Sequence, residues 1–292
     1  MEISKKIVPL QNQFQNLINM KQPVFKYFLF AFAGLTLWNT SCIQKQTISG
    51  DNDIKFDSIR IVAVQYLFDD STKPNCNLDL QFVYPVDFKD KNVLAGIQNQ
   101  FIASFFGEDY INLTPQQAAD KFKSDYLAEY KNVEKDYLAD KERDAEEGPA
   151  PDNWYSWFLT KKISIKFNKN GLLGYLVNDE TTRLYYLLNL KDGQLLKEKD
   201  IFSEDYQAEL SNLLVAELMK QNNVSSPDEL FVLGYFGAVE LLPNDNFMID
   251  EKGITYLYNE REIASDLCGT VEIFVPYGKL KHLLNPESPV NP

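Results

Sequence analysis

The chain has 292 residues and a formal net charge of −13, from 29 basic and 42 acidic side chains. Residues 1–41 contribute about +3 of that charge, so the rest of the chain carries about −16. Such acidity argues against a nucleic-acid partner, which needs a basic surface, and against adhesion of the folded body to anionic lipid. Hydrophobic residues make up 45% of the chain, enough to bury a sizeable core in one large or two modest domains.

The N-terminal part resembles a secretory signal. Lys21 and Lys26 precede an apolar run over 27–38, and Thr40-Ser41 lead directly to Cys42. A basic segment, a short apolar segment and small residues before a cysteine are typical of a bacterial lipoprotein signal. The run is too short to span a bilayer, and its alternative reading is a buried core helix. We therefore expect a signal over 1–41, a lipidated Cys42 and a protein held by lipid on a membrane face of the bacterial cell envelope, periplasmic or outer. Translation would then start at Met1 or at Met20.

A linker over 42–55 leads to a first predicted unit at 56–145. Alternating apolar residues predict strands over 56–68 and 78–84, and helical spacing predicts a helix over 93–105. Thr114-Pro115-Gln116-Gln117 combines a capping box with a proline in the first turn, which predicts the start of a longer helix.

The segment 146–152 is rich in chain-breaking residues and is the predicted domain boundary. The second unit, 155–286, begins with an alternating strand up to Phe167 and a turn at 168–171. Ser203 and Ser226 are predicted helix caps, and short strands end the chain. The predicted fold class is α+β, with antiparallel sheets and packed helices in a two-part body.

The cysteine and histidine content argues against a metal site. Cys76 and Cys268 follow the lipidation site, and an exported protein can join them as a disulfide or leave them as two buried thiols. His282 is the only histidine, and its position favours a solvated helix end over a catalytic base. We expect no metal and no cofactor.

No known catalytic motif occurs in the sequence. It contains no Gly-x-Ser-x-Gly elbow, no zinc-protease helix motif, no phosphate-binding loop and no calcium loop. Acidic pairs in turns do not indicate glycosidase carboxylates, which face one another across a cleft. One aromatic cluster, 154–158, contains Trp154 and Trp157 and is a candidate surface for stacking a sugar or contacting a partner, although half of it is expected in the core.

The C-terminal part resembles a known family. Residues 246–264 and 269–277 are similar to the C-terminal domain of the RsiV-type family, which forms the exported region of certain anti-sigma factors and recurs in bacterial lipoproteins. Residues 56–145 are similar to the accessory domain found beside the catalytic domain of PdaC-type peptidoglycan deacetylases. One departure is Ser265-Asp266-Leu267-Cys268, where the family has Pro-Tyr. The positions that carry the RsiV-type resemblance are Phe247, Gly253, Tyr258, Asn259, Glu262, Ile263, Gly269, Pro276 and Tyr277.

The resemblance implies binding, and it supplies no catalytic residue. Its anti-sigma relatives suggest a cationic, lysozyme-like protein as partner, and the deacetylase context suggests a peptidoglycan-binding module as the alternative. A wall-glycan enzyme is the third interpretation. Asn259 and Glu262 either cap backbone groups or contact a ligand. The candidate partner-binding residues are Asn259, Glu262, Asp266, Trp154 and Trp157.

Lipidation of Cys42 is directly testable. Cells fed an alkyne fatty acid should label the wild-type protein, and the label should disappear in Cys42→Ala because the acceptor thiol is gone. Cys268→Ala is the matched control and should keep the label. Equal labelling of wild type and Cys42→Ala would contradict the lipoprotein interpretation.

Overall fold

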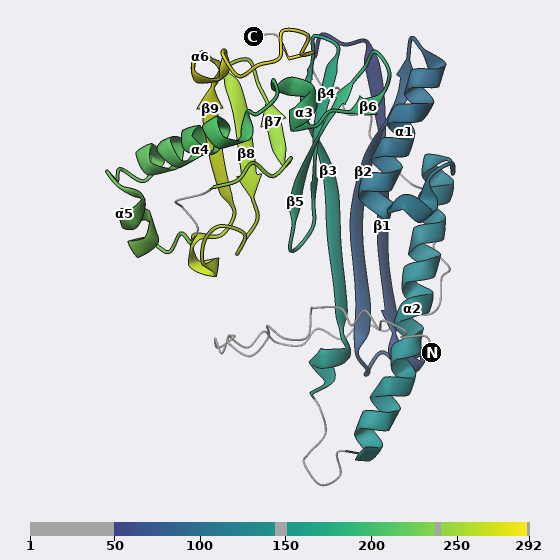
Figure 1. Cartoon of the computed structure of the whole chain (residues 1–292). Coiled ribbons are helices and arrows are strands. Elements are labelled where there is room, and N and C mark those ends of the chain that lie inside the picture. Colours follow the sequence, from purple (N-terminus) through teal and green to yellow (C-terminus); the bar gives the residue numbers. More distant parts are fainter. Residues whose placement is uncertain (1–49, 144–150, 237–240, 291–292) are drawn as a thin grey trace, which may run out of the picture.

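The computed structural model describes residues 50–143, 151–236 and 241–290 (Figure 1). A six-stranded sheet forms its larger part and carries two long helices on one face. The strands are β1 (Ile54–Tyr66), β2 (Asn75–Phe88), β3 (Trp157–Lys169), β4 (Leu172–Asn178), β5 (Arg183–Asn189) and β6 (Gln194–Leu195). The helices are α1 (Lys91–Phe106) and α2 (Pro115–Arg143), and short 3₁₀ turns are η2 (Leu67–Asp69), η3 (Glu108–Tyr110) and η4 (Asp152–Tyr155).

The sheet is mixed, because β2 and β3 run parallel while its other neighbouring strands are antiparallel. Parallel neighbours need a crossover connection, and α1 with α2 supplies it. The breaker-rich segment 146–152 therefore lies inside this crossover. The two predicted units, 56–145 and 155–286, share one sheet and one core, so the division predicted at 146–152 does not separate two packed bodies.

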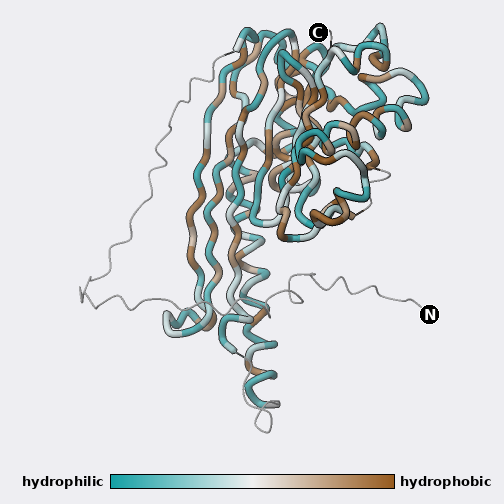
Figure 2. Tube along the Cα trace, turned by 90° about the vertical axis from the view of Figure 1, so that its left-hand side faces the viewer, coloured by the Kyte–Doolittle hydropathy of each residue, from teal (hydrophilic) through white to brown (hydrophobic). Residues whose placement is uncertain are grey.

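Hydrophobic and hydrophilic residues alternate along the long strands (Figure 2), and one set of their side chains packs beneath α1 and α2. Ile59 and Ile61 of β1 and Leu78, Leu80 and Phe82 of β2 face the helices and are buried. The predicted helical stripe of α1 fills this core from the other side. Its buried residues are Val93, Leu94, Ile97, Phe101, Ile102, Phe105 and Phe106.

A smaller unit, called here the lobe, packs on the opposite face of the sheet over β3 to β5 (Figure 1). Gly174 of β4 lies so close to Met248 that a β-carbon at position 174 would stand 2.3 Å from the Met248 sulfur. The lobe contains a three-stranded antiparallel sheet. Its elements are α3 (Glu198–Ile201), α4 (Gln207–Gln221), α5 (Pro227–Val232), β7 (Phe247–Ile249), β8 (Gly253–Tyr258), η5 (Asp266–Cys268), β9 (Val271–Pro276) and α6 (Tyr277–Leu280).

The α+β fold class is confirmed, and so are several local predictions. Thr114 and Gln117 form the predicted capping box, and the Ser226 hydroxyl accepts from the Glu229 amide at the start of α5. The prediction that Ser203 caps a helix was wrong: α4 begins at Gln207, and the Ser203 amide donates instead to the Leu283 carbonyl.

The half of the sheet beyond the lobe extends with α2 as an arm. Tyr130, Tyr155 and Cys76 form a small core there, and the Tyr130 hydroxyl donates to the Tyr155 carbonyl at 3.0 Å. Within the described ranges, no helix combines the length and hydropathy that crossing a bilayer requires.

Candidate partner-binding site

Two asparagine side chains join the lobe to β5. The Asn246 Oδ1 accepts from the Tyr185 amide at 2.8 Å, and its Nδ2 donates to the Arg183 carbonyl at 3.0 Å. The Asn259 Oδ1 accepts from the Arg183 amide at 2.7 Å. These amide groups take the place of a neighbouring strand on this stretch of the β5 edge, where unpaired backbone groups would otherwise need water or another chain.

Glu262 stabilises the same joint. Its Oε2 accepts from the Asn259 amide at 2.8 Å, and its Oε1 accepts from the Asn244 side chain at 2.8 Å. Of the two roles open to Asn259 and Glu262, the structure shows the capping of backbone groups. Asp266 forms an exposed ion pair with Arg261 at 3.0 Å. A role for these three residues in contacting a partner stays a prediction.

Glu198 ties the start of the lobe to its sheet. Its Oε1 accepts from the Asp245 amide at 2.9 Å, its Oε2 accepts from the Tyr206 hydroxyl at 2.9 Å, and its own amide donates to the Asp245 carboxylate. The Glu198 side chain is buried. Desolvation raises the pKa of this carboxyl above its usual value, although the bonds from Asp245 and Tyr206 oppose the shift.

The lower end of the lobe exposes a group of large apolar side chains, called here the lobe patch. The turn after α5 and the loop containing η5 are held side by side, since the Phe236 amide donates to the Ile263 carbonyl and the Ser265 amide to the Gly234 carbonyl. Gly234 has φ of +96°, a conformation that favours glycine. The members of the patch are Phe231 (72% exposed), Val232 (83%), Leu233 (48%), Phe236 (43%) and Leu267 (94%).

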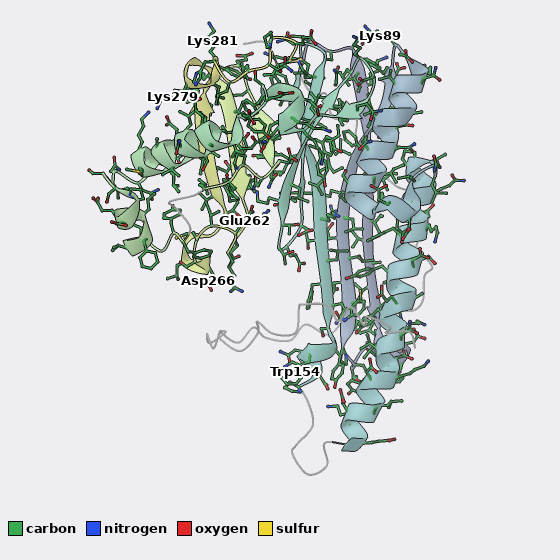
Figure 3. The ribbon with its side chains drawn as sticks, viewed as in Figure 1. Lys89, Trp154, Glu262, Asp266, Lys279 and Lys281 are labelled. Atoms are coloured by element: carbon green, nitrogen blue, oxygen red, sulfur yellow. The ribbon has the colours of Figure 1, made fainter. Side chains whose placement is uncertain are left out.

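The lobe patch is formed by two acidic segments, and their carboxylates are called here the rim. The two segments that form it, 226–236 and 259–269, contain five acids and a single base, Arg261. The acids are Asp228, Glu229, Glu260, Glu262 and Asp266. Figure 3 shows Glu262 and Asp266 at the lower end of the lobe. Large apolar side chains within a charged rim are the composition of a protein-binding surface, and the sign of the rim suits a cationic partner.

The two tryptophans of the predicted aromatic cluster have different environments. Trp154 lies in η4 at the far end of the arm and is 58% exposed (Figure 3). Trp157 is half-buried, with its ring centroid 5.7 Å from that of Tyr126 and 5.4 Å from that of Tyr130. Trp157 therefore contributes to packing between β3 and α2, and Trp154 keeps an open face. The structure places Trp154 and the Asn259–Gly269 loop on different elements and does not bring them into one site.

Both described cysteines are free thiols, so the disulfide alternative is not realised. Cys76 is buried in the core of the arm, where desolvation raises the pKa of its thiol to about 11. Cys268 belongs to the lobe and contacts the Leu233 carbonyl at 3.5 Å. Cys42 lies outside the described residues.

His282 is exposed and pairs with Glu209. Among the described side chains, no group of three or more His, Cys, Asp or Glu is arranged to hold a metal ion.

The comparisons with known proteins identify the family. Residues 199–278 match the family described as "Protein of unknown function (DUF3298)". The crystal structure of a DUF3298 family member from Bacteroides fragilis is 31% identical to this chain, with a TM-score of 0.75. That similarity covers 81% of this chain and 95% of the relative. The chain therefore belongs to the DUF3298 family.

A second solved structure, a DUF3298 family protein from Pseudomonas aeruginosa, shares the fold at 11% identity and a TM-score of 0.51, covering 80% of this chain and 97% of that one. No curated protein matches the chain.

The lobe patch is not predicted from the sequence. Its sequence signal is the apolar run Leu230-Phe231-Val232-Leu233 at the end of α5, a helix in which Leu230 is the one buried residue. An apolar run of this kind is equally consistent with a buried strand and with the buried end of a helix. Only the tertiary structure shows that its side chains face solvent.

We expect the joint at the β5 edge to contribute measurably to stability. Asn246→Ala removes a donor and an acceptor and leaves the Tyr185 amide and the Arg183 carbonyl without those partners, at a cost of about 1–3 kcal/mol in the free energy of unfolding. Urea denaturation measures the change. Asn285→Ala, which removes a bond at the exposed C-terminal loop, should cost less. Equal stability of wild type and Asn246→Ala would contradict a structural role for the joint.

The raised pKa of Glu198 gives a pH dependence with a defined sign. A carboxyl whose folded pKa lies above its unfolded value stabilises the fold when protonated, and this contribution is lost as pH rises through the folded pKa. The difference in unfolding free energy, wild type minus Glu198→Gln, should therefore be most favourable to wild type near pH 4 and fall toward pH 7. The exposed Glu204→Gln is the control. A difference that is independent of pH, or that grows with pH, would contradict the assignment.

Proposed function

We propose that this protein is a lipid-anchored protein of the bacterial cell envelope that binds a cationic protein partner through the lobe patch. The observation that carries the proposal is the exposed apolar group of Phe231, Val232 and Leu267 within a rim of five carboxylates. Apolar anchors that lose their exposure on binding supply most of the affinity of such an interface. The surrounding charge speeds the encounter with a partner of opposite sign.

The resemblance to the RsiV-type family suggests what the partner is. The exported regions of anti-sigma relatives point to a lysozyme-like protein, which is cationic and acts on the cell wall. The segment in which this chain departs from that family, 265–268, forms part of the lobe patch and supplies Leu267. We therefore expect this chain to prefer a different cationic protein from the one preferred by family members that have Pro-Tyr in place of 265–268.

The position of Gly50, the first described residue, indicates which end of the sheet lies nearer to Cys42. Gly50 lies beside Asn168, and the Asp51 amide donates to the Asn168 carbonyl at 2.9 Å, so the described chain begins where β3 ends. Trp154 precedes the start of β3 at the opposite end of the strand (Figure 3). A lipid on Cys42 is eight residues from Gly50, which reaches at most roughly 28 Å when extended. The anchor would hold the Gly50 end near the membrane.

The proposal predicts salt-sensitive binding to a cationic protein. Hen lysozyme, used as the probe in biolayer interferometry, should bind the lipid-free protein at low ionic strength, and association should slow roughly tenfold on raising salt to about 0.15 M. Phe231→Ser with Leu267→Ser should weaken the dissociation constant by at least about tenfold. Absence of wild-type binding at low salt would overturn lysozyme-like proteins as the partner.

Two further variants separate charge from burial. Asp228→Asn with Glu260→Gln removes rim acids for which no internal hydrogen bond is described and should mainly slow association. Glu129→Gln with Asp136→Asn removes two exposed acids of α2 at the same total charge and should change little. An equal effect of both pairs would show that net charge, and not the lobe patch, attracts the partner.

Exposed Trp154 favours a second candidate function, the binding of wall glycan. A flat, exposed indole can stack on a sugar ring. Co-sedimentation with purified peptidoglycan tests this directly. Retention of the wild type and loss of retention in Trp154→Ala would support glycan binding, whereas a wild type that stays in solution would contradict it.

A further inference from the structure

The strand registers define which side chains share the lobe-facing side of the sheet. Tyr185 and Arg183 of β5 point toward the lobe, since both contact Glu272 of β9. Pairing transfers this direction from strand to strand, because directly opposed residues project from the same face. Three rows on this face follow from the pairing. They are Val64–Asn77–Phe158, Val62–Asp79–Thr160 and Arg60–Gln81–Lys162.

The lobe covers only part of this face. It packs over β3 to β5 at the end of the sheet near Gly174 (Figures 1 and 2). The three rows lie on β1, β2 and β3 in the arm. Val62 is 57% exposed, Val64 51% and Phe158 56%. We call these three residues the sheet patch. Trp154 precedes the same end of β3 and adds a fourth exposed apolar side chain close by in the chain.

The sheet patch differs from an ordinary solvated sheet face. Alternation normally places polar residues on the open side, as Gln81 and Thr160 do here. Val62 and Val64 instead lie on the edge strand β1, where exposed apolar residues invite association. The nearby charges balance, because Arg60 pairs with Asp79 at 3.1 Å across β1 and β2, while Lys162 of the third row and Glu180, which accepts from the Thr160 amide, have opposite signs. The patch is therefore apolar with a nearly neutral surround.

We propose that the partner bound by the lobe patch also contacts the sheet patch, so that the recognition surface extends from the lobe onto the arm. This proposal rests on the proposed function. Both patches lie on the side of the sheet opposite α1 and α2. Asp266 of η5 lies at the lower end of the lobe, the end nearer the arm (Figure 3). A globular protein bound to the acidic lobe patch can then contact the sheet patch as a second part of the same interface.

Charge decides between a foreign protein and a second copy of this chain. Two copies would bring bodies of about −16 together, and the acidic rim of one lobe patch would face another acidic surface. A cationic protein is attracted electrostatically to the lobe patch and is not repelled by the near-neutral sheet patch. Two separated apolar contacts on one rigid protein also bring the buried area closer to the roughly 800 Å² per partner of a standard interface.

Matched variants test the two-part surface with hen lysozyme as the probe. Phe158→Ser with Val64→Ser should weaken binding by about tenfold or more, because each serine removes an apolar contact from the interface. Leu138→Ser with Leu184→Ser is the control, since these exposed leucines lie on α2 and on the helix-facing side of β5. The control pair should change the dissociation constant by less than about twofold.

A second readout guards against a folding defect. Amide hydrogen exchange of the wild-type complex should show new protection in 60–66 and 157–162 together with 228–236 and 262–268, and none in 130–143 of α2. Exchange in the free variants should match the free wild type if they fold normally.

The outcomes separate this proposal from the proposed function. If Phe231→Ser with Leu267→Ser loses binding while the sheet-patch variant binds as wild type, the extension onto the arm is overturned and the proposed function stands. Loss of binding in both pairs, with protection of both surfaces, supports both. Loss in the sheet-patch variant alone supports a site on the arm and overturns the lobe patch. A wild type that binds no lysozyme overturns both proposals for this partner.

Discussion

The arrangement of the molecule depends on how the edge of β5 is satisfied. A strand edge in the middle of a protein must pair, be covered or be solvated, because each unpaired buried backbone group costs about 1–3 kcal/mol. β6 pairs with only the last two residues of β5, Leu188 and Asn189. The Asn246 and Asn259 side chains satisfy the other end of the strand, and in doing so they attach the lobe there.

This joint explains why polar residues near strand ends of the lobe carry so many internal bonds. The Glu262 carboxylate accepts from the Asn259 backbone amide and so orients Asn259. The Asn244 side chain donates both to Glu262 and to the carbonyl of Leu257. At the entry to the lobe, the backbone amides of Glu198 and Asp245 each donate to the other residue's side-chain carboxylate. Because these contacts are directional, they define the angle between the lobe and the six-stranded sheet, and with it the placement of the lobe patch relative to the arm.

Local structure could be predicted from the sequence where a short pattern has one physical meaning. The turn at 168–171 was predicted and occurs as the β3–β4 hairpin, with Asn170 and Gly171 both at positive φ. The parallel pairing of β2 with β3 was not predictable, because nothing local distinguishes a crossover from a linker. The breakers at 146–152 therefore predict a domain boundary, although they belong to the crossover between β2 and β3.

The candidate site was only partly predictable for a related reason. The resemblance identifies the Asn259–Gly269 loop, yet the role of Asn259 depends on Arg183, more than 70 residues earlier in the chain, and Glu262 acts on Asn259. Exposure of Phe231 and Leu267 depends on how the lobe packs as a whole. Alternation in β1 indicated two faces, but which face the lobe covers, and how far along the arm, follows only from the register of five strands.

The acidity of the chain and its exposed apolar surface are best understood together. An apolar patch of this kind on a neutral protein is a site for self-association, since burying it is favourable by about 25 cal/mol per Å² whatever the partner. A net charge near −16 opposes contact between two copies but not contact with a cationic protein. Under the proposed function, this charge selects among partners, and the apolar side chains provide the affinity that exposed charges cannot supply.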